Sequence, residues 1–308
     1  MENSDQTPNK EGIGMISKLW DFEFIKNEKT RHIVDIVCKI LLYYGISAVV
    51  SVGTRIITGM IRGEGEAPDF VTPAFVTFGA VRELLFVLAY VLLARYIPYK
   101  NRIVKGLLFV FLFWTTDYLP QIIAMLGAYS PVILPEAITF FTIAADSFGY
   151  VINGLLMGLI LSPKETVDKK SITRSQYAKS ILISSTSFAG LLGILEELIS
   201  LINPAYSTRA LFQIATEDSL QYYVVFYLFQ AVSGGMFAVF YRLTEYNADR
   251  KLGWLRFIVV HGLMIWSPII LIMAFFGLSV SSTILYEIVM MISLSISHVL
   301  VGLIMEKR

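Results

Sequence analysis

The sequence has 308 residues, of which 56% are hydrophobic and 16% are charged, whereas soluble domains average roughly 45–50% apolar and 25% charged residues. Its mean hydropathy of +0.66 excludes an ordinary soluble protein. Twenty-five Lys and Arg residues oppose twenty-four Asp and Glu residues, so there is no overall basic charge of the kind that binds nucleic acid. The single cysteine, Cys38, excludes a disulfide framework or a cysteine zinc cluster within one chain.

Eight apolar segments are separated by short polar stretches, and each is long enough for a membrane-spanning helix, which needs about 20 residues. They cover residues 33–53, 75–97, 103–127, 138–161, 178–202, 220–243, 254–277 and 281–304. The sequence therefore predicts an all-α, polytopic integral membrane protein with eight transmembrane helices over residues 33–304. Residues 1–32 are predicted to be a cytoplasmic tail, either loosely ordered or with an interfacial helix, and residues 305–308 a cytoplasmic C-terminus.

The orientation of these helices follows from their connections, because Lys and Arg are retained on the cytoplasmic side of short loops. Twenty of the twenty-five basic residues fall in the two termini and in every second connection. This alternation predicts that both termini are cytoplasmic. In the absence of a targeting signal for an organelle, we expect a multi-pass protein of the cell membrane.

The two halves of the chain, 33–161 and 178–304, share several features at an offset of roughly 145–150 residues. Trp114 and Pro120 match Trp266 and Pro268, and residues 157–160 match residues 301–304. We therefore consider a parallel 4+4 repeat as a hypothesis, against the alternative that apolar sequences resemble one another by composition. Proline kinks a spanning helix, so Pro120 and Pro268 are candidate gating kinks, although prolines are also simply tolerated in membrane helices.

Six carboxylates and one guanidinium are predicted to lie in the outer half of the membrane, where a charged side chain needs a partner, water or a function. They are Arg82, Glu83, Asp117, Asp146, Glu196, Glu197 and Glu287. We select Asp117, Asp146, Glu83, Arg82 and Glu287 as candidate substrate-binding or ion-binding residues. The alternative is structural pairing for the deeper acids and contact with interfacial water for Glu196, Glu197 and Glu287.

A second set of polar residues is predicted nearer the cytoplasmic side: Lys39, Asn153, His261 and His298. Asp35 and Lys39 are four residues apart and are expected to pair on one helix face. His261 and His298 lie at similar depth in sequential helices, so they are candidates for a metal site or a proton relay. The alternative is that each histidine only makes a structural hydrogen bond.

Glu196-Glu197, Phe257-x-x-x-His261 and His298 resemble a degraded form of the pattern of CAAX-type intramembrane proteases. That pattern also has an arginine and an asparagine, where this chain has Leu201 and Gly302. The resemblance implies an intramembrane enzyme with Glu197, His261 and His298 as an alternative metal set. On the predicted topology, however, Glu197 and the histidines are roughly 15–20 Å apart along the membrane normal, so otherwise we expect no metal.

The function that uses most of these features is a small carrier or permease that moves a cation, a cationic solute or a proton-coupled substrate. The alternatives are a non-catalytic membrane subunit or interaction protein, and the degenerate protease-like enzyme. We expect no cofactor. The expected partners are the lipid bilayer, a small solute or ion, and a second copy or a membrane complex. Gly154-x-x-x-Gly158 and Gly234-Gly235 are candidate close helix contacts, within the chain or between chains.

Overall fold

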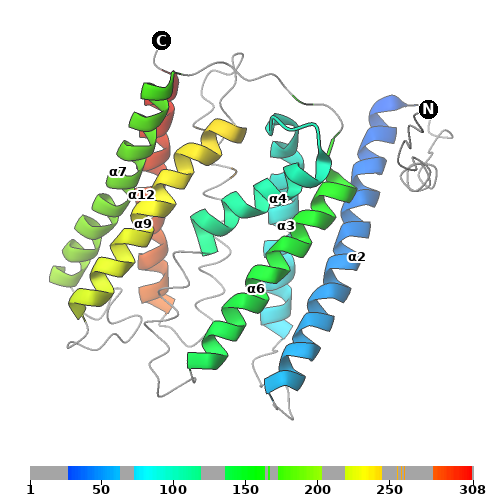
Figure 1. Cartoon of the computed structure of the whole chain (residues 1–308), viewed down its shortest axis with the longest axis horizontal. Helices are drawn as coiled ribbons and strands as arrows, with labels where there is room; N and C mark the ends of the chain where they lie inside the picture. Colours follow the sequence, from blue (N-terminus) through cyan, green and yellow to red (C-terminus); the bar gives the residue numbers. More distant parts are fainter. Residues whose placement is uncertain are drawn as a thin grey trace, which may run out of the picture.

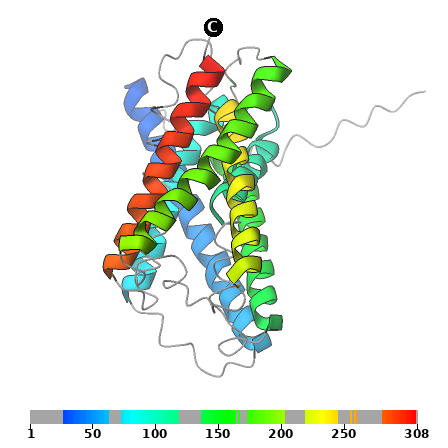
Figure 2. The ribbon, with the colours of Figure 1, turned by 90° about the vertical axis from the view of Figure 1, so that its left-hand side faces the viewer.

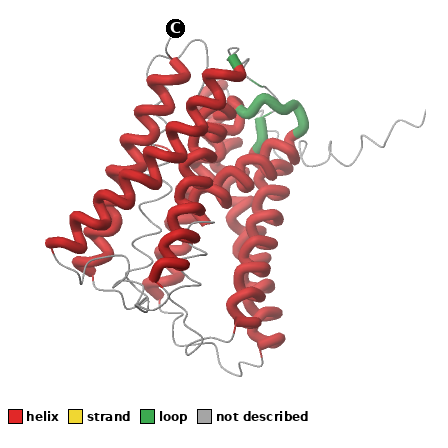
Figure 3. The backbone as a smooth tube through the Cα atoms, turned by 60° about the vertical axis from the view of Figure 1, so that its left-hand side comes forward, coloured by secondary structure: helices red, strands yellow, loops and turns green. Residues whose placement is uncertain are grey.

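The structure is a computed structural model that describes residues 27–62, 73–118, 136–163, 166, 173–202, 219–244, 255, 258, 260 and 280–306. The regular structure of these residues is helical throughout, with no strand (Figure 3). In chain order the helical elements are α2 (Glu28–Arg62), α3 (Pro73–Leu93), the 3-10 turn η1 (Ala94–Tyr96), α4 (Arg102–Phe113), the π-helical turn η2 (Trp114–Tyr118), α6 (Glu136–Leu156), the π-helical turn η3 (Met157–Leu161), α7 (Arg174–Ile202), α9 (Ser219–Thr244) and α12 (Val280–Glu306). The all-α prediction is confirmed for this part of the chain.

Seven of the apolar segments coincide with described helices, and most of the segment 254–277 lies outside the described residues. Two helices begin earlier than predicted because polar residues cap them. The Asn27 side chain accepts hydrogen bonds from the backbone N–H groups of Lys29 and Thr30, at 3.0 and 3.4 Å, so α2 begins at Glu28. The helix therefore starts five residues before the predicted apolar segment 33–53.

The start of α7 shows the same effect through a reciprocal cap. The Gln176 backbone N–H donates to Thr173 Oγ1 at 3.2 Å, and the Thr173 backbone N–H donates to Gln176 Oε1 at 3.4 Å. This capping box extends the helix to Arg174, four residues before the predicted start.

The described helices from α2 to α9 run alternately in opposite directions, and α12 runs in the same direction as α9 (Figures 1 and 2). The beginnings of α2, α4 and α7 and the ends of α3, α6, α9 and α12 lie at the upper end of Figure 1. Basic residues gather in the helix ends at this side: Lys29, Arg31, Arg95, Arg102, Arg174, Lys179 and Arg242. We call this side the basic end.

Two helices in the described part are long and apolar enough to cross a membrane, at Glu28–Val50 and Arg174–Ile202. This finding fits the membrane prediction for α2 and α7. The eight-span arrangement stays a prediction.

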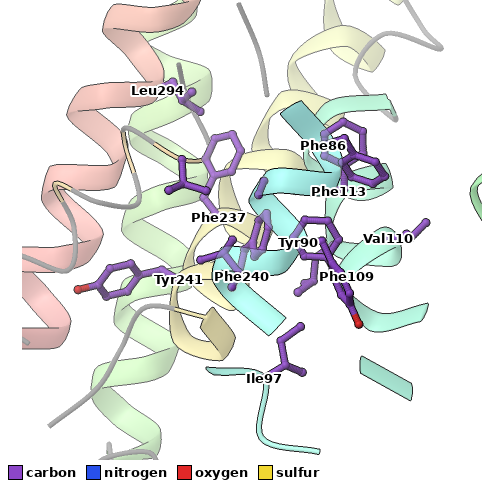
Figure 4. Packing of buried hydrophobic residues seen from close by; sticks show 14 of the residues in the cluster. Phe86, Tyr90, Ile97, Phe109, Val110, Phe113, Phe237, Phe240, Tyr241 and Leu294 are labelled. Carbon is purple, nitrogen blue, oxygen red and sulfur yellow. The ribbon is translucent and has the colours of Figure 1, made fainter. Parts of the chain in front are cut away.

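The helices form two groups that meet at α9. The first group is α2, α3, α4 and α6, and the second group is α7, α9 and α12 (Figure 1). An aromatic cluster joins the groups: Phe86 and Tyr90 of α3 pack against Phe109 of α4, with ring centroids 5.3 and 5.1 Å apart. Phe109 in turn contacts Phe240 of α9 at 5.8 Å, so the core continues from one group into the other (Figure 4).

Glycines bring α4 and α6 into backbone contact. A Cβ on Gly106 would lie 2.0 Å from the carbonyl oxygen of Gly154 and 2.6 Å from the amide nitrogen of Gly158. In the second group, a Cβ on Gly234 would lie 2.7 Å from the carbonyl oxygen of Ser184. The Gly154-x-x-x-Gly158 and Gly234-Gly235 motifs therefore make close contacts within the chain, as one of the two alternatives predicted.

Candidate functional site

Hydrogen bonds from one face of α2 connect the helices of the first group. The Tyr43 hydroxyl donates to Glu83 Oε1 of α3 at 2.7 Å, and the Ser47 hydroxyl donates to Asn153 Oδ1 of α6 at 3.1 Å. Tyr43 and Ser47 are one turn apart on α2, so a single helix face makes both bonds. A carboxylate that accepts from a buried phenol is held in one place, which gives Glu83 a structural partner that the sequence analysis did not identify.

The basic end of the first group is also held by buried polar contacts. Tyr90 and Ser162 share a hydrogen bond, and the Ser162 hydroxyl donates to the carbonyl oxygen of Arg102 at 3.2 Å. The buried Lys105 ammonium donates to the carbonyl oxygen of Pro163 at 3.1 Å. These bonds fix the start of α4 against the end of η3, so this region serves as a structural anchor.

The regular α-helix of α4 ends inside the molecule, where η2 continues as a π-helical turn. The Thr115 hydroxyl donates to the carbonyl oxygen of Phe111 at 3.0 Å, and the Thr116 hydroxyl donates to that of Leu112 at 2.9 Å. From α9, the Ser233 hydroxyl donates to the carbonyl oxygen of Thr116 at 2.6 Å. Side-chain hydroxyls therefore donate hydrogen bonds to backbone carbonyl groups where the α-helix changes to a π-helical turn. π-Helical turns are frequently found at functional sites.

His298 lies fully buried in the second group. Its Nδ1 atom lies 2.5 Å from the carbonyl oxygen of Leu294, and its ring stacks on Phe237 with centroids 5.0 Å apart. Because a carbonyl oxygen only accepts, Nδ1 carries the proton, and in the neutral ring Nε2 is then an acceptor. The bond to Leu294 gives His298 the structural role that was one of the two alternatives.

The outer candidate residues lie on four different elements. Glu83 is on α3 beside Arg82, Asp117 is in η2, Asp146 is on α6 and Glu287 is on α12. The side chains of Arg82, Asp117, Asp146 and Glu287 lie outside the described part of the structure, as does Pro120. The backbone nevertheless places Asp117 in the π-helical turn, and Asp146 precedes Ser147, which accepts a hydrogen bond from Trp114 Nε1 at 3.2 Å.

The structure does not bring together the residues predicted near the cytoplasmic side, Lys39, Asn153 and His298. Lys39 forms the predicted ion pair with Asp35 on α2, at 2.5 Å, and this pair is confirmed. Asn153 bonds to Ser47, whereas His298 lies on α12, on the far side of the molecule from α2 (Figure 1). His261 and Pro268 lie outside the described residues, so the histidine pair stays a prediction.

The protease-like pair Glu197 and His298 is separated in the structure. The Ser187 and Ser297 hydroxyls of the antiparallel helices α7 and α12 are 3.4 Å apart, so these two residues lie at one level. Glu197 is ten residues further along α7, about 15 Å at the helical rise, and its side chain is exposed. These two residues therefore cannot ligate one metal ion.

Several polar residues of the helix interfaces were missed from the sequence. They are Tyr43, Ser47, Thr116, Ser233, Gln230 and Ser293. Serine and threonine are common in spanning helices, so their presence alone carries little information. Gln230 is the amide in an otherwise apolar stretch of residues 224–232, and that contrast could have identified it.

Comparisons with family models, curated proteins and solved structures find no match to this chain. Within the part of the chain that the structure describes, no three His, Cys, Asp or Glu residues form a group that could hold a metal ion. The candidate site is the π-helical turn η2, which includes Asp117 and accepts a hydrogen bond from the buried Ser233 of α9.

Proposed function

We propose that the chain is a multi-pass protein of the cell membrane with eight spans and cytoplasmic termini, and that it carries a cation or cationic solute. Exposed apolar side chains on the outward helix faces support the membrane assignment. They occur on helices of both groups: Leu41, Val49, Phe111, Phe148, Leu182, Ile194, Val224, Leu228 and Leu303. In water such faces would favour aggregation, whereas lipid tails solvate them.

The basic end supports the proposed orientation. The described basic residues at this end come from connections that are far apart in the sequence, and the alternating helix directions bring them to one side (Figure 1). A membrane protein retains such residues on the cytoplasmic side. The proposed assignment puts both termini on that side.

The observation that carries the transport proposal is the helix interruption at η2. Carriers often bind solute where a spanning helix loses its regular hydrogen bonding, because backbone groups there can contact the solute. Asp117 belongs to this turn, and the turn contacts α9 of the other helix group through Ser233 and Thr116. Motion of one group against the other would then change access to this turn.

The predicted excess of carboxylates in the outer half favours a positively charged solute. Glu83 already accepts a hydrogen bond from Tyr43. We therefore assign Glu83 to the outer end of the proposed solute pathway and not to direct binding of the solute. Asp117 is the preferred binding residue because it lies in the interrupted turn itself.

The test is flux through the purified full chain in liposomes. Imposed gradients of protons, Na⁺, K⁺ and methylammonium are followed with a pH dye or radiolabelled ions. We expect flux of at least one of these ions, and Asp117→Asn should reduce it about tenfold or more. Glu197→Gln is the matched control, since it removes an exposed carboxylate on α7, outside the π-helical turn.

Equal flux in protein-free liposomes, or unchanged flux in Asp117→Asn, would contradict the carrier proposal. If the protein instead co-purifies in a stable complex and shows no flux, the non-catalytic subunit becomes the better account.

A further inference from the structure

The short connection between α3 and α4, at the basic end, carries three cationic side chains that solvent can reach: Arg95, Lys100 and Arg102. Residues 92–105 include a fourth basic residue, Lys105, and no Asp or Glu. The Lys105 ammonium is used inside the molecule, where it donates to the carbonyl oxygen of Pro163 at 3.1 Å. In the part of the chain that the structure describes, no carboxylate forms an ion pair with the other three. The connection therefore presents a positive charge that described side chains do not neutralise.

Hydrogen bonds hold the backbone of this connection along its length. The amide of Ile97 donates to the carbonyl oxygen of Ala94 at 3.3 Å, and the amide of Tyr99 donates to that of Ile97 at 2.9 Å. The Asn101 side chain then caps α4 and accepts from the amide of Ile103 at 2.9 Å. The turn η1 also packs against α4. The connection, one of the loops drawn in green in Figure 3, is therefore positioned by the fold before any ligand binds.

The cationic groups sit at two neighbouring helix ends. Arg95 Cζ lies 4.7 Å from the centre of the buried Tyr96 ring, and this cation–π contact positions the guanidinium at the end of α3. Arg102 is the first residue of α4, where the helix dipole adds partial positive charge. Lys100 lies between them in the chain. Guanidinium groups suit phosphate because their N–H groups can bond to two of its oxygens at once.

Exposed apolar side chains lie beside these cations, on the side toward the middle of each helix. Leu92 is three residues before Arg95 on α3, and Val104 is two residues after Arg102 on α4. They are 43% and 38% exposed. The exposed Tyr99 lies in the connection itself, and tyrosine is enriched where hydrocarbon meets headgroups. Both helices thus present an apolar side chain and then a cation toward the basic end, which matches the acyl chain and the phosphate of a phospholipid.

We propose that this connection binds an anionic phospholipid, with Arg95, Lys100 and Arg102 at the headgroup and Leu92 and Val104 against the acyl chains. The proposal goes beyond transport. It rests on the proposed function in one respect, the assignment of the basic end to the cytoplasmic surface, where anionic lipids attract basic segments. Binding can be measured on the solubilised protein without flux and without knowledge of its orientation.

The experiment is native mass spectrometry of the purified full chain in detergent, titrated with dioleoyl phosphatidylglycerol or dioleoyl phosphatidylcholine. The two lipids have the same acyl chains and differ in headgroup charge. We expect phosphatidylglycerol to bind about tenfold or more tightly. Glycerol 3-phosphate, which has the phosphate without acyl chains, is the soluble competitor and should not displace the lipid.

Arg95→Gln combined with Lys100→Gln should weaken phosphatidylglycerol binding about tenfold or more, since each basic residue near an anionic headgroup accounts for roughly a fivefold change in affinity. The matched control is Arg174→Gln combined with Lys179→Gln, which removes two exposed basic residues from the start of α7, also at the basic end. Both pairs change the net charge equally, and the control should keep the wild-type affinity. If the first pair does not fold, Lys100→Gln alone, at an exposed side chain, decides the question.

Equal affinities for the two lipids would overturn the site. Equal losses in the two double variants would also overturn it, because the basic end as a whole would then attract the lipid. Displacement by glycerol 3-phosphate would assign the connection to a soluble phosphate ester instead. Selective binding of phosphatidylglycerol without ion flux would support this site and contradict the carrier proposal, whereas flux in a protein with no lipid preference would support the carrier and overturn the site.

Discussion

The two helix groups differ in the contacts that hold their helices together. In the first group, the backbone of α4 at Gly106 touches Gly154 of α6 and Gly158 of η3, and polar side chains bond in pairs, such as Tyr43 with Glu83. In the second group, serines line the interface of α7, α9 and α12, and the buried Gln230 and Ser293 have unmet hydrogen-bonding capacity among the described residues.

The difference indicates a division of roles. A backbone contact between glycines leaves no room for alternative packings, so the first group is suited to be a rigid scaffold. An interface with unmet polar groups has a free-energy cost that a ligand can remove. The buried polar groups of the second group are therefore less completely hydrogen-bonded, among the described residues, than those of the first group.

The largest predicted loss of stability tests the backbone contact between α4 and α6. Gly106→Ala would put a Cβ 2.0 Å from the carbonyl oxygen of Gly154, and overpacking of this kind costs about 3 kcal/mol or more when backbone must move. We expect little folded protein by size-exclusion chromatography.

Gly149→Ala on α6 is the matched control for that substitution. A Cβ there meets nothing within 4 Å, and alanine favours a helix by roughly 0.5–1 kcal/mol over glycine. Equal yields and equal unfolding midpoints for the two variants would show that α4 and α6 are not in backbone contact.

A smaller effect tests the paired polar groups. Tyr43→Phe removes the phenol that donates to Glu83 at 2.7 Å, and loss of a hydrogen bond to a charged group costs about 1.5–3 kcal/mol. Denaturant unfolding should show this loss, and Tyr43→Phe combined with Glu83→Gln should be non-additive. Additive single effects would contradict the bond.

We expect almost no energetic coupling between Glu197 and His298, the two described residues of the protease-like pattern. Glu197 is exposed and about 15 Å along the axis from the level of His298. Glu197→Gln should therefore change the free energy of unfolding by less than about 0.5 kcal/mol, and its effect should add to that of His298→Phe. A strong coupling between the two substitutions would contradict this separation and would support a metal site shared by Glu197 and His298.

Much of the helical fold could be predicted from the sequence, because apolar length dominates in helices of this kind. The helix starts at Glu28 and Arg174 were missed because their capping residues, Asn27 and Thr173, precede the apolar segments from which the helices were predicted. The Asp35–Lys39 pair was predicted correctly because both residues lie on one helix, where spacing alone sets the contact.

The site was less predictable because its contacts cross between helices. Glu83 could be selected as a buried acid, but nothing in the spacing of α2 and α3 indicates that Tyr43 is its partner. Gln230 and Ser293 are both buried with an oxygen atom that has no hydrogen-bond partner among the described residues, and only the packing of their helices shows this. The sequence analysis selected carboxylates as candidate site residues. The structure shows that neutral side-chain oxygen atoms, such as Oε1 of Gln230, are also buried between the helices.

The most direct test of the contrast between the two groups is to compare the free energies of unfolding of Gln230→Met and Tyr43→Phe, measured with denaturant. Because Oε1 of Gln230 is buried without a hydrogen-bond partner among the described residues, Gln230→Met should leave the free energy of unfolding unchanged or raise it by about 1 kcal/mol. Tyr43→Phe should lower it by about 2 kcal/mol. A loss for Gln230→Met as large as that for Tyr43→Phe would contradict the account, since Gln230 would then be a structural residue with its hydrogen bonds already made.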